Sequence, residues 1–251
     1  MEFFLGFWDH VGQDVLCMVR ESRLIGRVSG TLNSTFIALI LKISKPDTFD
    51  DFRLISLCKF IYKIIYKVIA DRIKPFLSKV ISGEQFGFLP DRQILDAVGI
   101  TQEGIHTIKT KKMPTVLLKM DLIKAYDRID WIFLRLILVH VGLDGEMVRW
   151  IMACVCNVHF AVLINGAPTG FFQGQRGLRQ GFPLYPLLFL IVIDGLSQLI
   201  SDAKAKGDIQ GICISNSYAL SHILYVDDVL LFGGGDSKEW SKFLEIIQLF
   251  F

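Results

Sequence analysis

Short apolar runs alternate with amphipathic stretches along the chain, and their periods predict a mixture of strands and helices. Residues 35–43 and 115–120 are apolar runs of strand length, and a Ser-Lys-Pro-Asp turn signal at 44–47 closes the first. From residue 55 to 77, apolar residues recur at helical spacing with basic residues between them, which predicts an amphipathic helix. Three further stretches are expected to be helical: 123–140, 186–200 and 237–251.

Two pairs of short apolar runs are joined by turn-forming residues and predict hairpins. The dipeptide Asn-Gly at 165–166, the strongest short hairpin signal, separates one pair. The tetrapeptide Tyr-Val-Asp-Asp at 225–228 separates the other pair, 221–224 and 229–232, and carries two adjacent acids at its tip. Hairpins and helices without a repeating strand–helix–strand unit predict an α+β fold.

The composition is apolar for a globular protein, with 52% hydrophobic and 21% charged residues and a mean hydropathy of +0.45. The longest apolar stretch, 184–193, is about ten residues long, whereas a helix that crosses a bilayer needs about twenty. We therefore expect a buried core and no membrane association. The N-terminal residues lack the charge and cleavage pattern of a signal peptide.

Cysteine content indicates the cellular compartment, and neither cysteine content nor charge reveals the function. The five cysteines form an odd set without framework spacing, which fits a reducing, intracellular compartment, either nucleus or cytoplasm. The net charge is +2 and the pI is near 8.2, a weak electrostatic footprint for a nucleic-acid-binding protein. The basic face of the helix at 55–77 fits nucleic-acid contact and a solvated surface equally well.

Two carboxylate positions are the candidates for chemistry. Asp121 ends an apolar strand, and Asp227 and Asp228 lie at the tip of an apolar hairpin. An ordinary aspartate turn is the alternative, but unpaired charge held against core strands is costly, so the apolar flanks favour function. Magnesium binds few carboxylates together with phosphate oxygens and water, and two such ions about 4 Å apart can clamp a phosphoryl displacement.

Five motifs occur in an order and spacing that resemble the reverse transcriptases of LINE-type (non-LTR) retrotransposons, especially those of plants. The resemblance extends from about residue 7 to the end of the sequence. The motifs are Asp-Phe-Arg-Leu-Ile-Ser-Leu at 51–57, Gln-Phe-Gly-Phe at 85–88 with Arg92-Gln93, Lys119–Trp131, Arg176–Gly181 followed by Pro183-Leu184, and 225–228. A related intron maturase or a telomerase-like protein would share the palm, but the sequences Lys-Ala-Tyr-Asp at 124–127 and Arg-Gln-Gly at 179–181 favour the LINE group.

The resemblance implies a right-hand polymerase fold with fingers and palm, an antiparallel palm sheet and no thumb. Residues 1–114 would form an N-terminal extension and the fingers, and residues 115–251 the palm, truncated before the thumb. The implied activity is RNA-directed DNA polymerisation, a two-metal transfer of deoxynucleotides to a primer 3′-hydroxyl. The implied cofactors are two Mg²⁺ ions, with Mn²⁺ as a substitute. The implied partners are an RNA template, a DNA primer and deoxynucleoside triphosphates, and the oligomeric state stays open.

The resemblance also assigns roles to acids and an aromatic residue. Asp121 and Asp227 would bind both metal ions, and Asp228 would support them as the third acid of the metal site. Tyr126 stands five residues after Asp121, where the family places an aromatic steric gate against the ribose 2′-hydroxyl. Without the resemblance, a core aromatic would be the simpler interpretation of Tyr126.

Four further positions are candidates for substrate binding. Gln180 and Gly181 would lie against the nascent base pair, although a simple turn would explain them too. Arg53 and Arg92 are candidates for gripping the incoming triphosphate, since guanidinium groups suit phosphate oxygens. A surface salt bridge explains each arginine nearly as well.

Two aromatic residues depart from the family pattern around Gly181. Phe182 stands where an aspartate is usual, and Tyr185 where a serine is usual. We expect these replacements to disturb the packing or hydrogen bonding of the turn. They support an alternative function, that of a degenerate, catalytically inactive retrotransposon remnant with at most weak nucleic-acid binding.

Overall fold

The computed structural model describes residues 2–156, 158–179, 181–215 and 218–250. The chain forms two compact units, each assembled from two separate stretches. Unit 1 consists of Met1–Ile73 and Tyr126–Tyr185, and unit 2 of Lys74–Ala125 and Pro186–Phe251. The predicted regions 1–114 and 115–251 divide the chain by motif, differ from these units and stay predictions.

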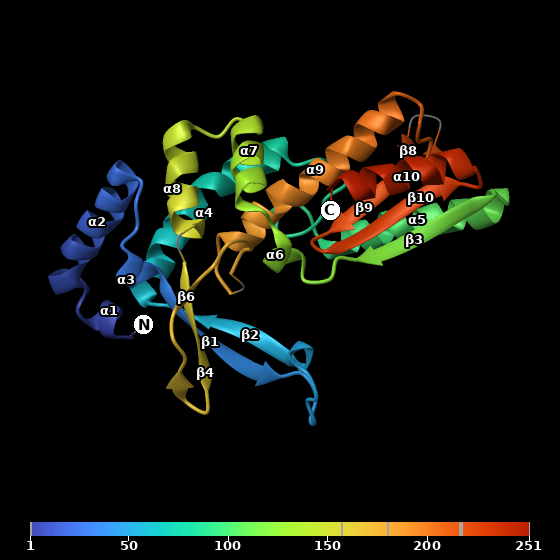
Figure 1. The fold of residues 1–251 in the computed structure, drawn as a ribbon. Coiled ribbons are helices and arrows are strands. Elements are labelled where there is room, and N and C mark those ends of the chain that lie inside the picture. The colour runs from blue at the N-terminus through green and yellow to red at the C-terminus, as the bar shows by residue number, and fades with distance from the viewer. Residues whose placement is uncertain (1, 157, 180, 216–217, 251) are drawn as a thin grey trace. The chain divides into compact units, whose positions relative to one another are not determined.

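Unit 1 contains a mixed sheet and several helices (Figure 1). Its sheet has the strand order β2-β1-β4-β5, with β6 also paired to β4; β1 runs antiparallel to β2 and parallel to β4. The strands are β1 (Ser34–Leu41), β2 (Phe52–Leu57), β4 (His159–Ile164), β5 (Ala167–Pro168) and β6 (Phe172–Gln173). The helices are α1 (Glu2–Gly6), α2 (Trp8–Ile25), α3 (Gly30–Asn33), the short 3₁₀ helix η1 (Phe49–Asp51), the start of α4 (Phe60–Val80), α6 (Ala125–Arg128, from residue 126), α7 (Trp131–His140) and α8 (Gly145–Val155).

Two predicted helices of unit 1 differ in their bounds from the sequence expectation. Residues 55–57, predicted to begin a helix, belong to β2, because they pair in register with β1. The single helix predicted for 123–140 is divided into α6 and α7. Asp130 causes the break, because its carboxylate accepts hydrogen bonds from the backbone N–H groups of Ile132 (2.7 Å) and Phe133 (2.9 Å) and thereby caps α7.

The Asn165-Gly166 hairpin is confirmed. Both residues have positive φ, 51° and 82°, as a two-residue type I′ turn requires. The strand that follows begins at Ala167 and is split into β5 and β6, both paired with β4.

Unit 2 is built around a three-stranded antiparallel sheet with the order β3-β10-β9, whose strands lie side by side in Figure 1. An antiparallel sheet, as expected from the sequence for this region, is therefore present, and its assignment as a palm stays a prediction. Its strands are β3 (Thr115–Asp121), β9 (His222–Tyr225) and β10 (Asp228–Gly234), and a separate pair is formed by β7 (Ile212–Ser215) and β8 (Tyr218–Leu220). The helices are the end of α4, α5 (Ile94–Lys111), α9 (Tyr185–Ala205, from residue 186) and α10 (Ser237–Phe250).

Alternation along β9 places a helix on each face of this sheet. Ile223 packs with Ala97 of α5 in one apolar cluster, which also contains Phe232. The neighbouring His222 points to the other face, where its Nε2 lies 2.7 Å from Ser197 Oγ of α9. Both faces of β9 and β10 are therefore buried, and the tip of the hairpin lies at the end of these buried strands.

Among the described helices, α9 is the one that is long and apolar enough to cross a membrane, with a mean hydropathy of 1.5 over its best window. However, 67% of that window is buried within the protein. Core helices of soluble proteins have the same properties, so α9 is weak evidence for a membrane span.

Candidate active site

The three candidate acids lie at one end of the unit 2 sheet. In the register of β3 and β10, Asp121 lies directly opposite Asp228, which places both side chains on the same face. Asp227 precedes Asp228 in the turn, and its carbonyl accepts a hydrogen bond from Leu122 N at 3.2 Å. Residues more than 100 positions apart in the sequence are thus held together by a strand ladder and one further backbone bond.

A lysine that the sequence did not suggest lies among these acids. Lys119 Nζ is 2.9 Å from Asp228 Oδ1. The hydrogen bond to Asp228, followed by the charges of Asp228, Asp121 and Asp227, raises the pKa of Lys119. Because Lys119 and Asp121 are two residues apart on a strand, they share a face, and this spacing could have identified the lysine.

The acids fit a site that shares its metal with substrate. Among the residues that the structure describes, no group of three or more histidine, cysteine, aspartate or glutamate side chains is gathered as a metal cage. Mg²⁺ does not need one, because it usually binds one or two carboxylates and takes its other ligands from phosphate and water. Asp121 and Asp227 are carboxylates of this kind, and their role as metal ligands stays a prediction. Asp228 is already paired with Lys119, so its role as a metal ligand stays a prediction.

Within unit 1, Tyr126 is fastened to the glycine-rich motif. Its carbonyl accepts a hydrogen bond from Leu178 N at 2.8 Å, and Gly177 N donates to Ile129 O at the same distance. A Cβ on Gly177, whose φ is +87°, would lie only 2.8 Å from the carbonyl oxygen of Asp127. The backbone of the half-buried Tyr126 is therefore held beside the 177–178 segment by a close approach that only glycine permits, and its steric-gate role stays a prediction.

Two residues are predicted to face the nascent base pair, and the structure describes one of them, Gly181. Gln180 lies outside the described residues. Gly181 is exposed and has φ of +92°, and a Cβ there would meet no atom within 4 Å. Glycine is thus required at 181 by its backbone conformation, and contact with a base pair stays a prediction.

Arg179, in the same motif, is a buried cation inside a cage of aromatic rings. Its side chain is enclosed so that only 6% of the residue is exposed. The guanidinium carbon lies 5.0–5.8 Å from the centroids of four rings, those of Tyr62, Tyr66, Phe182 and Tyr185. Such distances are within the range of cation–π attraction, which is strongest where water is excluded.

The hydrogen bonds of Arg179 all lead to neutral oxygens. Nε donates to Tyr185 Oη at 3.1 Å, Nη1 to Thr35 Oγ1 at 2.9 Å and Nη2 to Asn33 Oδ1 at 2.7 Å. Nη2 also donates to the hydroxyls of Tyr62 and Tyr66 and to the carbonyl of Cys154. Burial opposes the charge, but the surrounding tyrosine oxygens outweigh it and raise the pKa of Arg179. In the described part of the chain, no carboxylate is ion-paired with this cation.

The expectation that Phe182 and Tyr185 disturb the turn is wrong. Both side chains are buried, with 3% and 1% exposed, and their ring centroids are 5.4 Å apart in an edge-to-face arrangement. The Tyr185 hydroxyl bonds to both Arg179 and the Tyr66 hydroxyl. The physical reason is that the two rings complete the cage of Arg179, so the larger volume is accommodated and the added hydroxyl is satisfied.

The two arginines predicted to grip triphosphate have different surroundings. Arg53 is exposed on β2, in register with Ile40 of β1. The guanidinium of Arg92 instead donates to backbone carbonyls, those of Ser82, Gln85 (2.7 Å) and Ile81 (3.1 Å). It holds the end of α4 and the following turn, a role that the sequence did not predict. Phosphate binding by either arginine stays a prediction.

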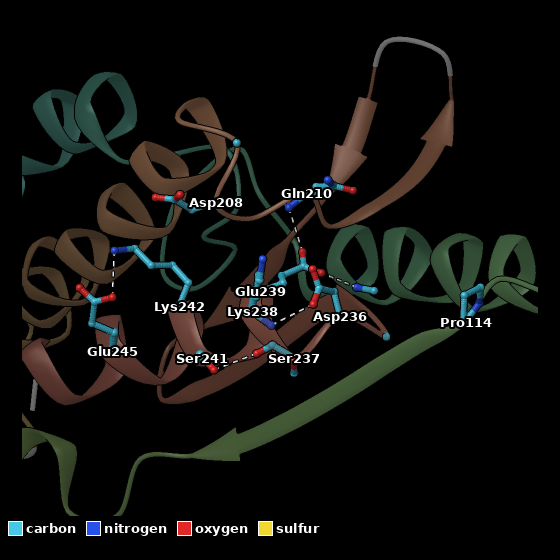
Figure 2. Close-up of a pocket in the computed structure, with 13 residues that line it drawn as sticks. Pro114, Asp208, Gln210, Asp236, Ser237, Lys238, Glu239, Ser241, Lys242 and Glu245 are labelled. Carbon is cyan, nitrogen blue, oxygen red and sulfur yellow. Dashed lines mark hydrogen bonds and ion pairs between the residues drawn. The ribbon is translucent and has the colours of Figure 1, made fainter.

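A separate polar cleft of about 720 Å³ lies at the start of α10 (Figure 2). Glu239 lines it and accepts hydrogen bonds from the backbone N–H groups of Gln210 (2.9 Å), Gly211 (2.8 Å) and Gly234 (2.6 Å). These bonds fasten α10 to the sheet. None of the three candidate acids lines this cleft.

Comparison with known proteins gives consistent results. The model of the family "Reverse transcriptase (RNA-dependent DNA polymerase)" matches residues 43–251. The chain is 28% identical over 194 residues to the "Transposon TX1 uncharacterized 149 kDa protein" of Xenopus laevis, covering 77% of this chain and 15% of that protein. It is 25% identical over 129 residues to a "Retrovirus-related Pol polyprotein from type-1 retrotransposable element R2" of Popillia japonica, covering 50% of this chain and 20% of that protein.

The fold is also similar to solved structures. Telomerase of Candida tropicalis, without its C-terminal domain, matches with a TM-score of 0.59 and 15% identity over 88% of this chain and 47% of that one. Telomerase of Candida albicans, in complex with a fragment of telomeric RNA, matches with a TM-score of 0.57 and 13% identity, covering 90% of this chain and 41% of that one. The chain thus spans less than half the length of each of these relatives and structures.

Proposed function

Because the chain belongs to the reverse transcriptase (RNA-dependent DNA polymerase) family, we propose that it is the fingers-and-palm part of an RNA-directed DNA polymerase. One observation carries the proposal. The register of β3 and β10, together with the turn between β9 and β10, brings Asp121, Asp227 and Asp228 to one end of the unit 2 sheet. A LINE-type retrotransposon polymerase is the class that fits the motifs and the relatives.

The proposed reaction joins the primer 3′-oxygen to the α-phosphorus of a deoxynucleoside triphosphate and releases pyrophosphate. Asp121 and Asp227 would hold the two Mg²⁺ ions, for which Mn²⁺ can substitute. When bound, such ions lower the pKa of the attacking hydroxyl and neutralise the leaving group. Asp228 would support this pair from its ion pair with Lys119, and the carboxylates would be aimed by the sheet before substrate arrives.

The remaining motif residues would select and orient the substrate. Tyr126, fixed by its backbone bond to Leu178, would exclude a ribose 2′-hydroxyl. Gly181 and Gln180 would face the nascent base pair, and Arg53 and Arg92 are the candidates for gripping the triphosphate. The partners would be an RNA template and a DNA primer in an intracellular compartment, nucleus or cytoplasm.

Primer extension tests this proposal. The purified chain is incubated with a poly(A)–oligo(dT) duplex, Mg²⁺ and labelled dTTP, beside Asp227→Ala and, as a matched control, Asp14→Ala on the exposed side of α2. We expect Mg²⁺-dependent incorporation by the wild-type chain and by Asp14→Ala, with none by Asp227→Ala. Absence of incorporation by wild-type protein that is folded by circular dichroism would instead leave a catalytically inactive remnant.

A further inference from the structure

The turn that carries Asp227 contains a residue in an unfavourable backbone conformation. Val226 has φ of +57° and is buried, with 8% exposed. A β-branched side chain is a genuine outlier in this left-handed region, because its Cβ crowds the carbonyl group. Such a conformation persists only where the surroundings determine it.

Gln85 is one of the neighbours that determine the conformation of Val226. Its side chain is fully buried, and its Oε1 accepts hydrogen bonds from two backbone groups, Gly87 N at 3.0 Å and Val226 N at 3.3 Å. The second bond joins residues 141 positions apart and ends on the strained residue itself. Because both donors are backbone N–H groups, they also set the orientation of the amide.

The backbone around Gln85 runs beside the catalytic hairpin as a short additional strand. Phe86 N donates to Leu224 O at 3.0 Å, Leu224 N donates to Glu84 O at 2.8 Å, and Gln85 forms a parallel bridge with Leu224. Arg92 holds the same segment from the other side through the Gln85 carbonyl. The Gln85 side chain that reaches Val226 therefore extends from a backbone segment that is itself held by hydrogen bonds to Leu224 and Arg92.

The amide nitrogen of Gln85 shows what this position requires. Nε2 is buried without a hydrogen-bond partner among the described residues. An unpaired buried donor is unfavourable, and an apolar side chain of the same length would avoid it. Glutamine at this position is therefore explained by its carbonyl oxygen, the atom that binds the turn.

Gly87 adds a steric constraint on the same turn. A Cβ at Gly87 would lie 2.5 Å from Val226 Cγ2 and 3.2 Å from Val226 N. The valine side chain fills the space that glycine leaves open. Residues 85 and 87 thus define the position of Val226 by one hydrogen bond and one packing contact.

We propose that Gln85 is a positioning residue: it holds Val226 in the left-handed conformation and so aims the adjacent Asp227. The positioning of Val226 is a property of the fold and holds whether or not the chain is a polymerase. The effect on catalysis rests on the proposed function. Gln85 belongs to a motif whose resemblance was to the fingers, yet it acts on the palm hairpin in the same compact unit.

Two variants of equal length separate the acceptor from the bulk of the side chain. Gln85→Met keeps the volume and removes the acceptor, whereas Gln85→Glu keeps an oxygen for both N–H groups. The matched control is Gln102→Met, at an exposed glutamine of α5. If Gln85→Met fails to fold by circular dichroism, Gly87→Ala perturbs the same turn by contact alone.

Hydrogen exchange of the Val226 amide is the first measurement. We expect Gln85→Met, or Gly87→Ala in its place, to accelerate exchange at least tenfold, while Gln85→Glu and Gln102→Met stay within twofold of wild type. A second substitution, Val226→Gly, should remove the sensitivity, because glycine adopts positive φ without support. Exchange at the wild-type rate in both Gln85→Met and Gly87→Ala would overturn the proposal.

Primer extension is the second measurement. We expect Gln85→Met to lower kcat at least tenfold with less than threefold change in KM for dTTP, and Gln85→Glu to restore most of kcat. An equal loss in Gln85→Met and Gln85→Glu would overturn the catalytic part. If no variant and no wild-type protein incorporates dTTP, the proposed function fails, and the exchange data still decide the role of Gln85 in the turn.

Discussion

Replacement of Arg179 by methionine is the sharpest test of the caged cation in unit 1. Methionine has a similar length and no donor, so the oxygens around it lose their guanidinium hydrogen bonds. These acceptors include the Asn33 amide oxygen, the Thr35 hydroxyl and the Cys154 carbonyl, all of which now receive a guanidinium hydrogen bond. The change also removes the charge that lies against four aromatic rings.

The expected cost follows from these contacts. A hydrogen bond to a charged group contributes roughly 1.5–3 kcal/mol, but bonds that converge on one side chain are not additive. Breaking a buried charge network by removing one partner typically costs about 3–5 kcal/mol. Since the neutral tyrosines can partly bond to one another, as Tyr62 and Tyr66 already do at 2.8 Å, we expect a loss of about 3–4 kcal/mol in the free energy of unfolding. That is a large share of the roughly 5–15 kcal/mol that a domain has.

Urea unfolding followed by far- and near-ultraviolet circular dichroism measures this loss. The matched control is Arg20→Met, because Arg20 is exposed on α2. We expect the control to differ from wild type by less than about 0.5 kcal/mol. A loss below about 1 kcal/mol for Arg179→Met would refute the reasoning, because the cage would then be nearly as stable without the cation.

Two further predictions concern single side chains. Burial, with a smaller contribution from Lys204, lowers the pKa of His222 to about 3, so the folded protein keeps the ring neutral while the unfolded chain takes up a proton below its ordinary pKa near 6.5. Stability is therefore present above pH 6.5 and is lost as the pH falls towards 3, by about 2 kcal/mol at pH 5, and His222→Asn should lack this pH dependence in urea unfolding. Asp130→Ala should lower the free energy of unfolding by about 1 kcal/mol through loss of the α7 cap, and Asp130→Ser should recover most of it in the same assay.

Each of these two predictions has a clear contradictory result. Equal changes in stability between pH 7 and pH 5 for wild type and His222→Asn would show that the ring is protonated in the fold. Equal stability of Asp130→Ala and wild type would show that the capping bonds are replaced by water at no cost.

The strands of the sheets could be predicted because local signals and tertiary context agree. The runs 115–120 and 229–232 are apolar, have strand length and end at acids or glycines, and they form the paired strands β3 and β10 of the unit 2 sheet. The predicted start of the helix at residue 55 is wrong, because residues 55–57 pair with β1 and are therefore extended. Local periodicity carries no information about such a distant partner.

One missed helix has a different physical reason. The buried face of α5 is formed by Ala97, Gly104 and Thr107, small residues that produce little apolar contrast along the sequence. Close approach of Gly104 to Ile212 and Leu220, 3.3 and 3.4 Å from a Cβ built there, explains why small residues are needed. A pattern based on large apolar residues does not detect a helix of this kind.

The acids of the candidate site were accessible from sequence, whereas their supports were not. A strand end and a hairpin tip identify Asp121 and Asp227 by short spacing alone. Gln85 and Arg179 act through bonds to residues 141 and 144 positions away. Their neighbours in the sequence are those of an ordinary turn, so only the fold reveals that one carries an acceptor to Val226 and the other fills an aromatic cage.

Binding of Mn²⁺ in the presence of dTTP, followed by the electron paramagnetic resonance signal of the free ion, tests the central claim most directly. That claim is that the carboxylates of Asp121 and Asp227 together hold a divalent ion beside an incoming deoxynucleotide. We predict that wild-type protein and the control Asp14→Ala bind the ion with dTTP at least tenfold more tightly than Asp121→Asn or Asp227→Ala. Equal binding by all four proteins, each folded by circular dichroism, would contradict the claim.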